Sequence, residues 1–192
     1  MSKLALFGGD PLIKELFKPY MPMDEIERKA VEDVMKKGIL SSYIAAAGDS
    51  FMGGEAVKEL EDKAEKYFGV KHAIAVNSWT SGLICSVGAI GIEPGDEVIV
   101  TPWTMSASAS AILHWNGIPV FADINKDTFN IDPISIEKNI SPQTKAIMAV
   151  DIFGQSADMV EIMKIAKNHN LKVISDTAQA PGALLNGKFT GT

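Results

Sequence analysis

Short apolar runs alternate with amphipathic segments along most of the chain, from residue 72 onward. Brief apolar runs predict buried strands, and segments of helical periodicity between them predict βαβ units. Such units form a mainly parallel sheet flanked by helices on both faces, so the expected fold class is α/β. The predicted strands cover residues 72–77, 97–101, 118–123, 146–151 and 171–176, and the predicted helices cover residues 83–91, 106–115, 133–139 and 159–169.

The N-terminal part has a different pattern. Residues 1–22 place prolines and glycines between apolar residues, which predicts an extended arm with turns. Residues 23–37 carry acids at their start and lysines at their end, and Gly38 follows, as in a helix with favourable ends. A second amphipathic helix is predicted at residues 55–67. We therefore expect an N-terminal arm over residues 1–22 and an α/β domain over residues 23–192.

The last residues of the sequence predict the start of a β-hairpin. Residues 182–192 read GALLNGKFTGT, and Asn186-Gly187 is a favoured two-residue hairpin turn. No capping helix or polar tail follows this hairpin. We therefore expect the α/β domain to be truncated, that is, incomplete at its C-terminus.

Composition and charge narrow the classes of function. The net charge of −6 and the absence of a basic patch argue against a nucleic-acid surface. The N-terminus lacks the apolar core of a signal peptide, and no apolar run reaches the roughly 18 residues of a membrane span. The single cysteine, Cys85, suits a reducing cytosol, and we expect it to be buried in an apolar helix. We therefore expect a cytoplasmic protein that binds neither nucleic acid nor membrane, and the scattered histidines predict no metal site.

Three hydroxyl residues and a glycine lie just before the predicted helix 83–91, in the segment Asn77-Ser78-Trp79-Thr80-Ser81-Gly82. A helix start exposes unpaired N–H groups and carries partial positive charge, so this segment favours a phosphate. The alternative is plain N-capping by Ser78 or Thr80. The segment has neither the glycines of a dinucleotide fold nor the G-K-[ST] of a Walker loop, so both nucleotide-binding motifs are excluded.

An acid stands at the end of the last predicted strand, in the segment KVISDTAQAP over residues 172–181. Open α/β sheets bind ligands at the carboxyl ends of their strands, where Asp176 is expected. A carboxylate that faces a heteroaromatic nitrogen keeps it protonated, which makes pyridoxal phosphate an electron sink. The alternative is an acid that caps the next turn. If the strand before Thr80 and the strand of Asp176 are parallel neighbours, both groups lie at one edge and fit a phosphorylated heteroaromatic cofactor.

Five motifs, in this order, resemble the DegT/StrS-type sugar aminotransferases, which are fold-type I pyridoxal-phosphate enzymes. The motifs are S-W-T-S-G-L, P-G-D-E-V-I-V-T-P-W-T, P-V-F-A-D-I, F-G-Q-S-A-D-M and V-I-S-D-T-A-Q-A-P-G-A. The match runs from about Ile13 to the last residue. The resemblance implies the large domain of such an enzyme, with pyridoxal 5'-phosphate as its cofactor.

The resemblance also implies roles for individual residues. Asp176 is expected to pair with the pyridinium nitrogen, and Gln179 to hydrogen-bond the 3-oxygen of the cofactor. Ala178 is expected to pack against one ring face. Thr80 and the backbone N–H of Trp79 are expected to hold the phosphate.

Three positions depart from the family pattern. Trp79 stands where relatives usually carry glycine, and its indole is expected to face the substrate. Met105 stands where an aromatic residue often covers the second ring face, while Trp103 lies two residues earlier; a thioether can pack on a ring, so we assign this contact to Met105. Asp151 replaces a histidine that is common in relatives.

The resemblance further implies a lysine that forms a Schiff base with the cofactor and moves protons. In relatives this lysine follows the D-x-A-Q motif by a further strand. Lys188 is the one lysine after Asp176 and falls in the predicted turn, and Lys172 is about 13 Å from Asp176 along an extended strand. We therefore expect the Schiff-base lysine to be absent from this chain, and the chain to be the N-terminal half of an aminotransferase that is inactive by itself.

The function implied is transfer of an amino group from glutamate to a nucleotide-linked keto-sugar. The expected context is nucleotide-sugar, lipopolysaccharide or polysaccharide biosynthesis, by a cytoplasmic homodimer. One alternative is a sugar dehydratase of the same fold, in which histidine replaces the lysine. Another is a catalytically silent chain that binds a cofactor or a partner.

Overall fold

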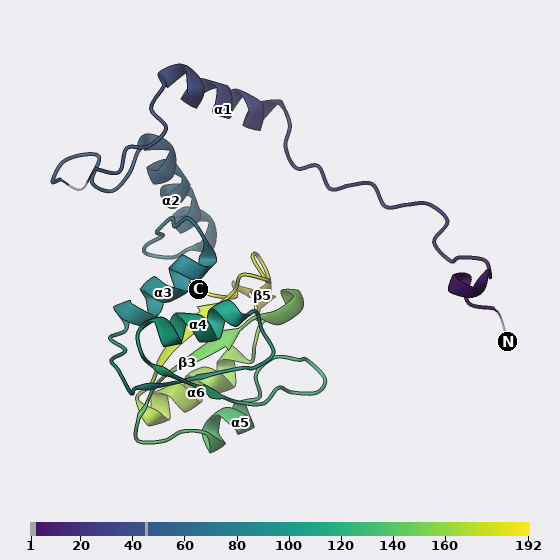
Figure 1. The fold of residues 1–192 in the computed structure, drawn as a ribbon, viewed down its shortest axis with the longest axis vertical. Coiled ribbons are helices and arrows are strands. Elements are labelled where there is room, and N and C mark those ends of the chain that lie inside the picture. The colour runs from purple at the N-terminus through teal and green to yellow at the C-terminus, as the bar shows by residue number, and fades with distance from the viewer. Residues whose placement is uncertain (1–2, 45) are drawn as a thin grey trace. The chain divides into compact units, whose positions relative to one another are not determined.

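The computed structural model describes residues 3–44 and 46–192, and the chain divides into two compact units, residues 1–55 and 56–192. Figure 1 traces the elements of both units along the chain. Each unit is described by itself. The domain boundary that the sequence suggests after residue 22 stays a prediction.

The first unit contains the 3-10 helix η1 (Ala5–Phe7) and the helix α1 (Glu25–Lys37). The α1 helix begins with a reciprocal cap: the Ile26 N–H donates to the Asp24 carboxylate at 2.8 Å, and the Asp24 N–H donates to Glu27 at 2.8 Å. It ends at Gly38, whose φ of 69° is a left-handed conformation that glycine adopts without strain. The helix predicted at residues 23–37 is therefore confirmed, apart from its first two residues.

The second unit is built on a parallel sheet with the strand order β2-β1-β3-β4. The chain passes from β1 to β2 on one side and then crosses to β3 on the other side of β1. This reversal creates a switch point between β1 and β3, the kind of place where open α/β sheets bind ligands outside the carboxyl ends of their strands. The strands are β1 (Glu97–Val100), β2 (Ile118–Phe121), β3 (Thr144–Val150) and β4 (Lys172–Asp176).

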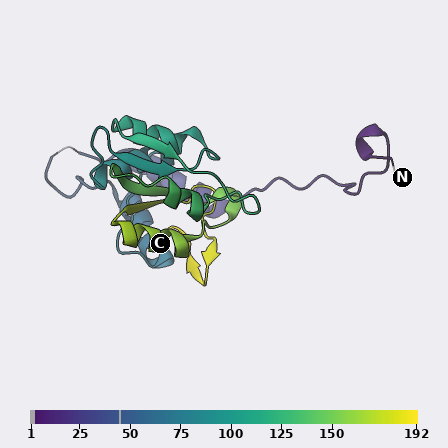
Figure 2. The same cartoon turned by 90° about the horizontal axis from the view of Figure 1, so that it is seen from below.

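Helices cover both faces of this sheet (Figure 2), which confirms the α/β fold class. The helices of the unit are α2 (Glu55–Phe68), α3 (Trp79–Ala89), α4 (Ser106–His114), α5 (Pro133–Lys138) and α6 (Met159–His169), with the 3-10 helix η2 (Ile152–Gly154) after β3. The α6 helix has the bounds that the sequence predicts, and α4 and α5 each end one residue earlier than predicted.

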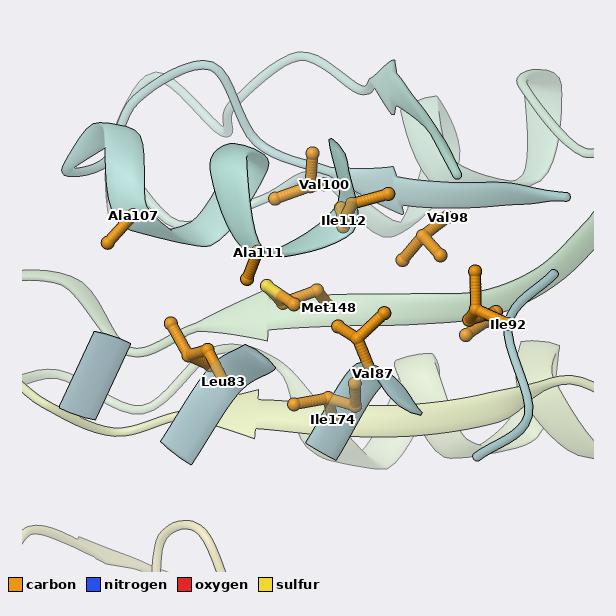
Figure 3. Close-up of a cluster of buried hydrophobic side chains, with 11 residues drawn as sticks. Leu83, Val87, Ile92, Val98, Val100, Ala107, Ala111, Ile112, Met148 and Ile174 are labelled. Atoms are coloured by element: carbon orange, nitrogen blue, oxygen red, sulfur yellow. The ribbon is translucent and has the colours of Figure 1, made fainter. Parts of the chain in front are cut away.

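Alternate residues of the central strands enter two separate cores. Val98 and Val100 of β1 face one side with Met148 of β3, and there they pack against α3 and α4 (Figure 3). Ile99 and Ile147 face the opposite side, together with residues of α5 and α6. Because both faces are buried, the inner residues of β1 and β3 form continuous apolar runs, which is why they stand out in the sequence.

The helix predicted at residues 83–91 is α3, which starts four residues earlier and ends two residues earlier. Two further expectations about this unit are wrong. Residues 72–77 form no strand in the described structure: the N–H groups of Ala73 and Ala75 donate to Glu65 and Glu61 of α2 instead. Cys85 is exposed rather than buried, because it lies on the outward face of α3.

The predicted hairpin near the end of the sequence is confirmed. Strands β5 (Leu184–Leu185) and β6 (Lys188–Phe189) pair antiparallel. Asn186 and Gly187 form the turn with φ values of 52° and 79°, and both values lie in the left-handed region that this turn requires.

Candidate functional site

Asp176 is the last residue of β4 and lies at the carboxyl edge of the sheet, with only 5% of its surface exposed. Its backbone carbonyl accepts a hydrogen bond at 2.9 Å from the N–H of Asp151, which follows the neighbouring strand β3. One carboxylate oxygen, Oδ2, accepts from the Ser108 hydroxyl at 2.8 Å. The other, Oδ1, accepts from the Trp79 indole N–H at 2.6 Å and from the Ala178 N–H at 3.3 Å. A buried carboxylate is thus fixed by donors from three segments.

The start of α3 lies beside this carboxylate, because Trp79 is its first residue and reaches Asp176 directly. The Ser78 hydroxyl accepts from the Ser81 N–H at 3.1 Å, so Ser78 is the N-cap, as the N-capping alternative predicts. The N–H groups of the first turn, at Trp79 and Thr80, have no acceptor within the helix, and the helix dipole adds partial positive charge. The capped helix start therefore remains suited to an anion, and it lies at the same edge as the acid.

Ser108 is a site residue that the sequence analysis missed. It lies in α4 and is fully buried, and its hydroxyl also pairs with the Thr104 hydroxyl at 3.0 Å. A serine between Ala107 and Ala111, on the face of α4 that packs against the sheet, was the available signal. A buried hydroxyl requires a partner, and here the partner is the carboxylate.

Gln179 is tied to the loop after β3. Its side-chain oxygen accepts from the Phe153 N–H at 3.1 Å, which leaves the amide nitrogen as the donor end of the side chain. Phe153 has a φ of 54°, a left-handed conformation that is uncommon for a residue other than glycine. Gln179 and Asp176 are thus held at the edge that β3 and β4 share.

The two candidates for the ring contact both lie before α4. Met105 is the residue at the N-cap position of α4, and 68% of its surface is exposed. Trp103 is also exposed and lies near Phe129, with ring centroids 6.1 Å apart. The assignment of Met105 to the second ring face stays a prediction.

Asp151, the residue that departs from the family pattern, is fully buried and holds several segments together. Its carboxylate accepts from the Ala157 N–H at 2.7 Å, from the Thr177 and Thr190 hydroxyls at 2.8 Å each, and from the Ser175 hydroxyl at 3.3 Å. These donors come from the loop after β3, from β4 and the residue after it, and from the residue after β6. Asp151 therefore holds in place the segments that carry Asp176 and Gln179.

No group of three or more potential metal ligands occurs within residues 3–44 and 46–192. Over the same ranges, no helix combines the length and the apolar character that a membrane crossing needs.

The donors and acceptors at this edge fit a phosphorylated heteroaromatic cofactor. Asp176 already accepts a hydrogen bond from the N–H of a planar aromatic ring, the Trp79 indole, so its carboxylate has the chemistry to accept one from a protonated ring nitrogen. The start of α3 offers backbone N–H groups to an anion. Both ends of such a cofactor therefore find groups of suitable chemistry within one edge of the sheet.

Known proteins with similar sequences include several named for sugar or polysaccharide biosynthesis. The spore coat polysaccharide biosynthesis protein SpsC of Bacillus subtilis is 41% identical over 162 residues, which are 84% of this chain and 38% of SpsC. GDP-perosamine synthase of Caulobacter vibrioides is 45% identical over 139 residues, which are 72% of this chain and 38% of that enzyme. The chain therefore spans less than half the length of these curated relatives.

Solved structures of similar fold include an aminotransferase and a keto-sugar dehydratase. The aminotransferase from Psychrobacter cryohalolentis is 36% identical with a TM-score of 0.82, over 92% of this chain and 42% of its own. A GDP-4-keto-6-deoxymannose-3-dehydratase with a trapped PLP-glutamate geminal diamine is 27% identical with a TM-score of 0.80, over 90% of this chain and 44% of its own.

A sequence profile of one family matches residues 26–192, which is most of the chain. The cofactor indicated is pyridoxal phosphate. The family supports it, and so do structural neighbours that hold pyridoxal or pyridoxamine phosphate. The chain belongs to the DegT/DnrJ/EryC1/StrS aminotransferase family.

Proposed function

We propose that the protein containing this chain transfers an amino group from glutamate to a keto-sugar linked to a nucleoside diphosphate. The observation that carries the proposal is the buried Asp176 carboxylate, set beside the start of α3 at the carboxyl edge of the sheet. The names of the relatives, among them GDP-perosamine synthase, support the nucleotide-sugar substrate. The balanced reaction converts glutamate to 2-oxoglutarate and the sugar ketone to an amine.

Each residue of the site has a separate task in this proposal. Pyridoxal phosphate, when bound, supplies an electron sink for amino-group transfer. Asp176 holds a proton at the ring nitrogen, and Ser108 fixes the orientation of the Asp176 carboxylate. Thr80 and the backbone N–H of Trp79 bind the phosphate, and Gln179 donates to the 3-oxygen.

We place the Schiff-base lysine outside these residues. Lys172 begins β4, at the opposite end of the strand from Asp176, and Lys188 lies exposed next to the β5–β6 turn. We infer that neither lysine reaches a group bound beside Asp176. We also propose a cytoplasmic homodimer as the working form, by analogy with the family.

A second candidate function is removal of a hydroxyl group from a keto-sugar. The similarity to GDP-4-keto-6-deoxymannose-3-dehydratase favours it, because that enzyme shares both the fold and the cofactor. A third candidate is a silent chain that binds the cofactor or a partner without turnover.

An assay of the complete natural polypeptide that contains these residues separates the candidates. The polypeptide is incubated with pyridoxal phosphate, glutamate and a set of nucleoside-diphosphate keto-sugars, including GDP-4-keto-6-deoxymannose. We expect an amino-sugar and an equal amount of 2-oxoglutarate, and Asp176→Asn should lower the rate by at least about a hundredfold, as loss of a buried electrostatic contact does. A deoxygenated sugar would favour the dehydratase, and no product from any sugar would contradict both enzymatic readings.

A further inference from the structure

The side chain of Trp79 occupies the acceptor that a bound cofactor ring would use. Its Nε1 donates to Asp176 Oδ1 at 2.6 Å. The six-membered part of the indole lies over Gly82, where a built Cβ atom would come within 2.8 Å of the ring. The indole thus lies along the first turn of α3 and ends at the carboxylate.

The acceptor capacity of Asp176 is nearly filled in this arrangement. A carboxylate oxygen accepts about two hydrogen bonds. Oδ1 already accepts from Trp79 and from the Ala178 N–H, while Oδ2 accepts from the buried Ser108 hydroxyl. A second planar ring cannot place its nitrogen against Oδ1 while the indole is there.

The indole is nevertheless able to leave. Trp79 is 43% exposed and belongs to neither buried hydrophobic cluster of the unit. It is the first residue of α3, where side chains have few neighbours along the helix. The hydrogen bond to Asp176 and the contact with Gly82 are then what hold it at the site.

We propose that Trp79 competes with the cofactor for Asp176, so that the ring nitrogen of pyridoxal phosphate binds only after the indole has turned away. The binding-competent state is then the fraction of molecules with the indole displaced, and the apparent affinity is reduced by that fraction. This inference rests on the cofactor of the family and not on the sugar or the amino donor.

The test compares the affinity of the complete natural polypeptide and two variants for pyridoxine 5'-phosphate. This probe has no aldehyde, so Schiff-base formation contributes nothing, and no substrate is present. Trp79→Phe keeps an aromatic ring and removes the N–H. Trp115→Phe is the matched control, because the Trp115 indole donates at 2.7 Å to the Ile84 carbonyl in the middle of α3 and has no hydrogen bond with Asp176 among the described residues.

We expect Trp79→Phe to bind the probe about tenfold more tightly, a difference of about 1.4 kcal/mol, and Trp115→Phe to bind as the wild type does. Titration calorimetry measures both. Unchanged or weaker binding by Trp79→Phe overturns the proposal, and so does the absence of binding by that variant. Failure of the sugar assay alone would leave this result standing.

A measurement on the wild type decides the question if Trp79→Phe does not fold. Nitrogen-15 NMR of the complete natural polypeptide, labelled at its tryptophans, follows the indole N–H signals as pyridoxine 5'-phosphate is added. We expect the Trp79 signal to shift on binding, because its hydrogen bond to Asp176 is lost, and the Trp115 signal to stay in place. A Trp79 signal that does not shift at saturating probe contradicts the competition.

Discussion

Asp176 receives hydrogen bonds from α3, from α4 and from the turn that follows β4. Part of this arrangement follows from the sequence: an acid at the end of an apolar strand is expected at the carboxyl edge of a parallel sheet. The Ala178 contact bears out the capping alternative, and it is compatible with the proposed role at the cofactor, since one carboxylate can do both.

Other residue contacts could not be predicted. The indole of Trp79 reaches Asp176 across 97 positions of sequence, and nothing in the order of residues fixes its rotamer. The resemblance predicts that this side chain faces the substrate, whereas in the structure it donates to the acid. Ser108 was missed for a similar reason, because its partner is distant along the chain.

Ser108→Ala tests whether this hydroxyl orients the acid. Removing the hydroxyl leaves Asp176 Oδ2 without its buried donor, which costs about 1–3 kcal/mol of folding free energy. We expect this loss in urea unfolding, together with weaker binding of pyridoxine 5'-phosphate. Ser110→Ala is the control: Ser110 is an exposed residue of the same helix, and its hydroxyl donates to the Ala107 carbonyl at 3.3 Å. Its variant should stay within about 0.5 kcal/mol of the wild type. Equal effects of the two variants would refute the role of Ser108.

Helices of the second unit were predicted well where the sequence shows both a helical spacing of apolar residues and residues that cap the helix ends. The α6 helix starts after Asp158, whose carboxylate caps it, and ends at Asn170 with a φ of 55°. The segment 72–77 was mispredicted because an apolar run becomes a strand only beside a partner strand. Within the described residues, two of its N–H groups pair with glutamates of α2 instead.

Asp151 connects several elements around the site, so its removal should destabilise their packing. Asp151→Ala leaves the Ala157 N–H and the hydroxyls of Thr177 and Thr190 without their acceptor. We expect a loss of about 2–4 kcal/mol in unfolding free energy and looser binding of the cofactor, since buried polar groups left unpaired are costly. Hydrogen exchange should speed up at β4.

The control for this prediction is Asp127→Ala, at an exposed residue of the loop after β2, with an expected change within about 0.5 kcal/mol. If Asp151→Ala proved as stable as this control, Asp151 would not hold these segments together.

At the scale of the whole molecule, the chain spans less than half the length of its curated relatives. The candidate site on it therefore consists of one edge of the sheet. The sheet, its switch point and the acid at its edge come from the described residues. The Schiff-base lysine, the sugar contacts and the partner subunit belong to the proposal for the complete protein. The fold class could be predicted because it depends on local periodicity, whereas the site depends on side chains that converge from distant segments.

The central claim is that Asp176 keeps the ring nitrogen of pyridoxal phosphate protonated. The most direct measurement is the nitrogen-15 NMR shift of ring-labelled pyridoxal phosphate bound to the complete natural polypeptide, with Asp176→Asn for comparison. We predict a protonated nitrogen at neutral pH in the wild type and an unprotonated one in the variant, because only a carboxylate stabilises the added charge. The same protonation state in both proteins would contradict the account.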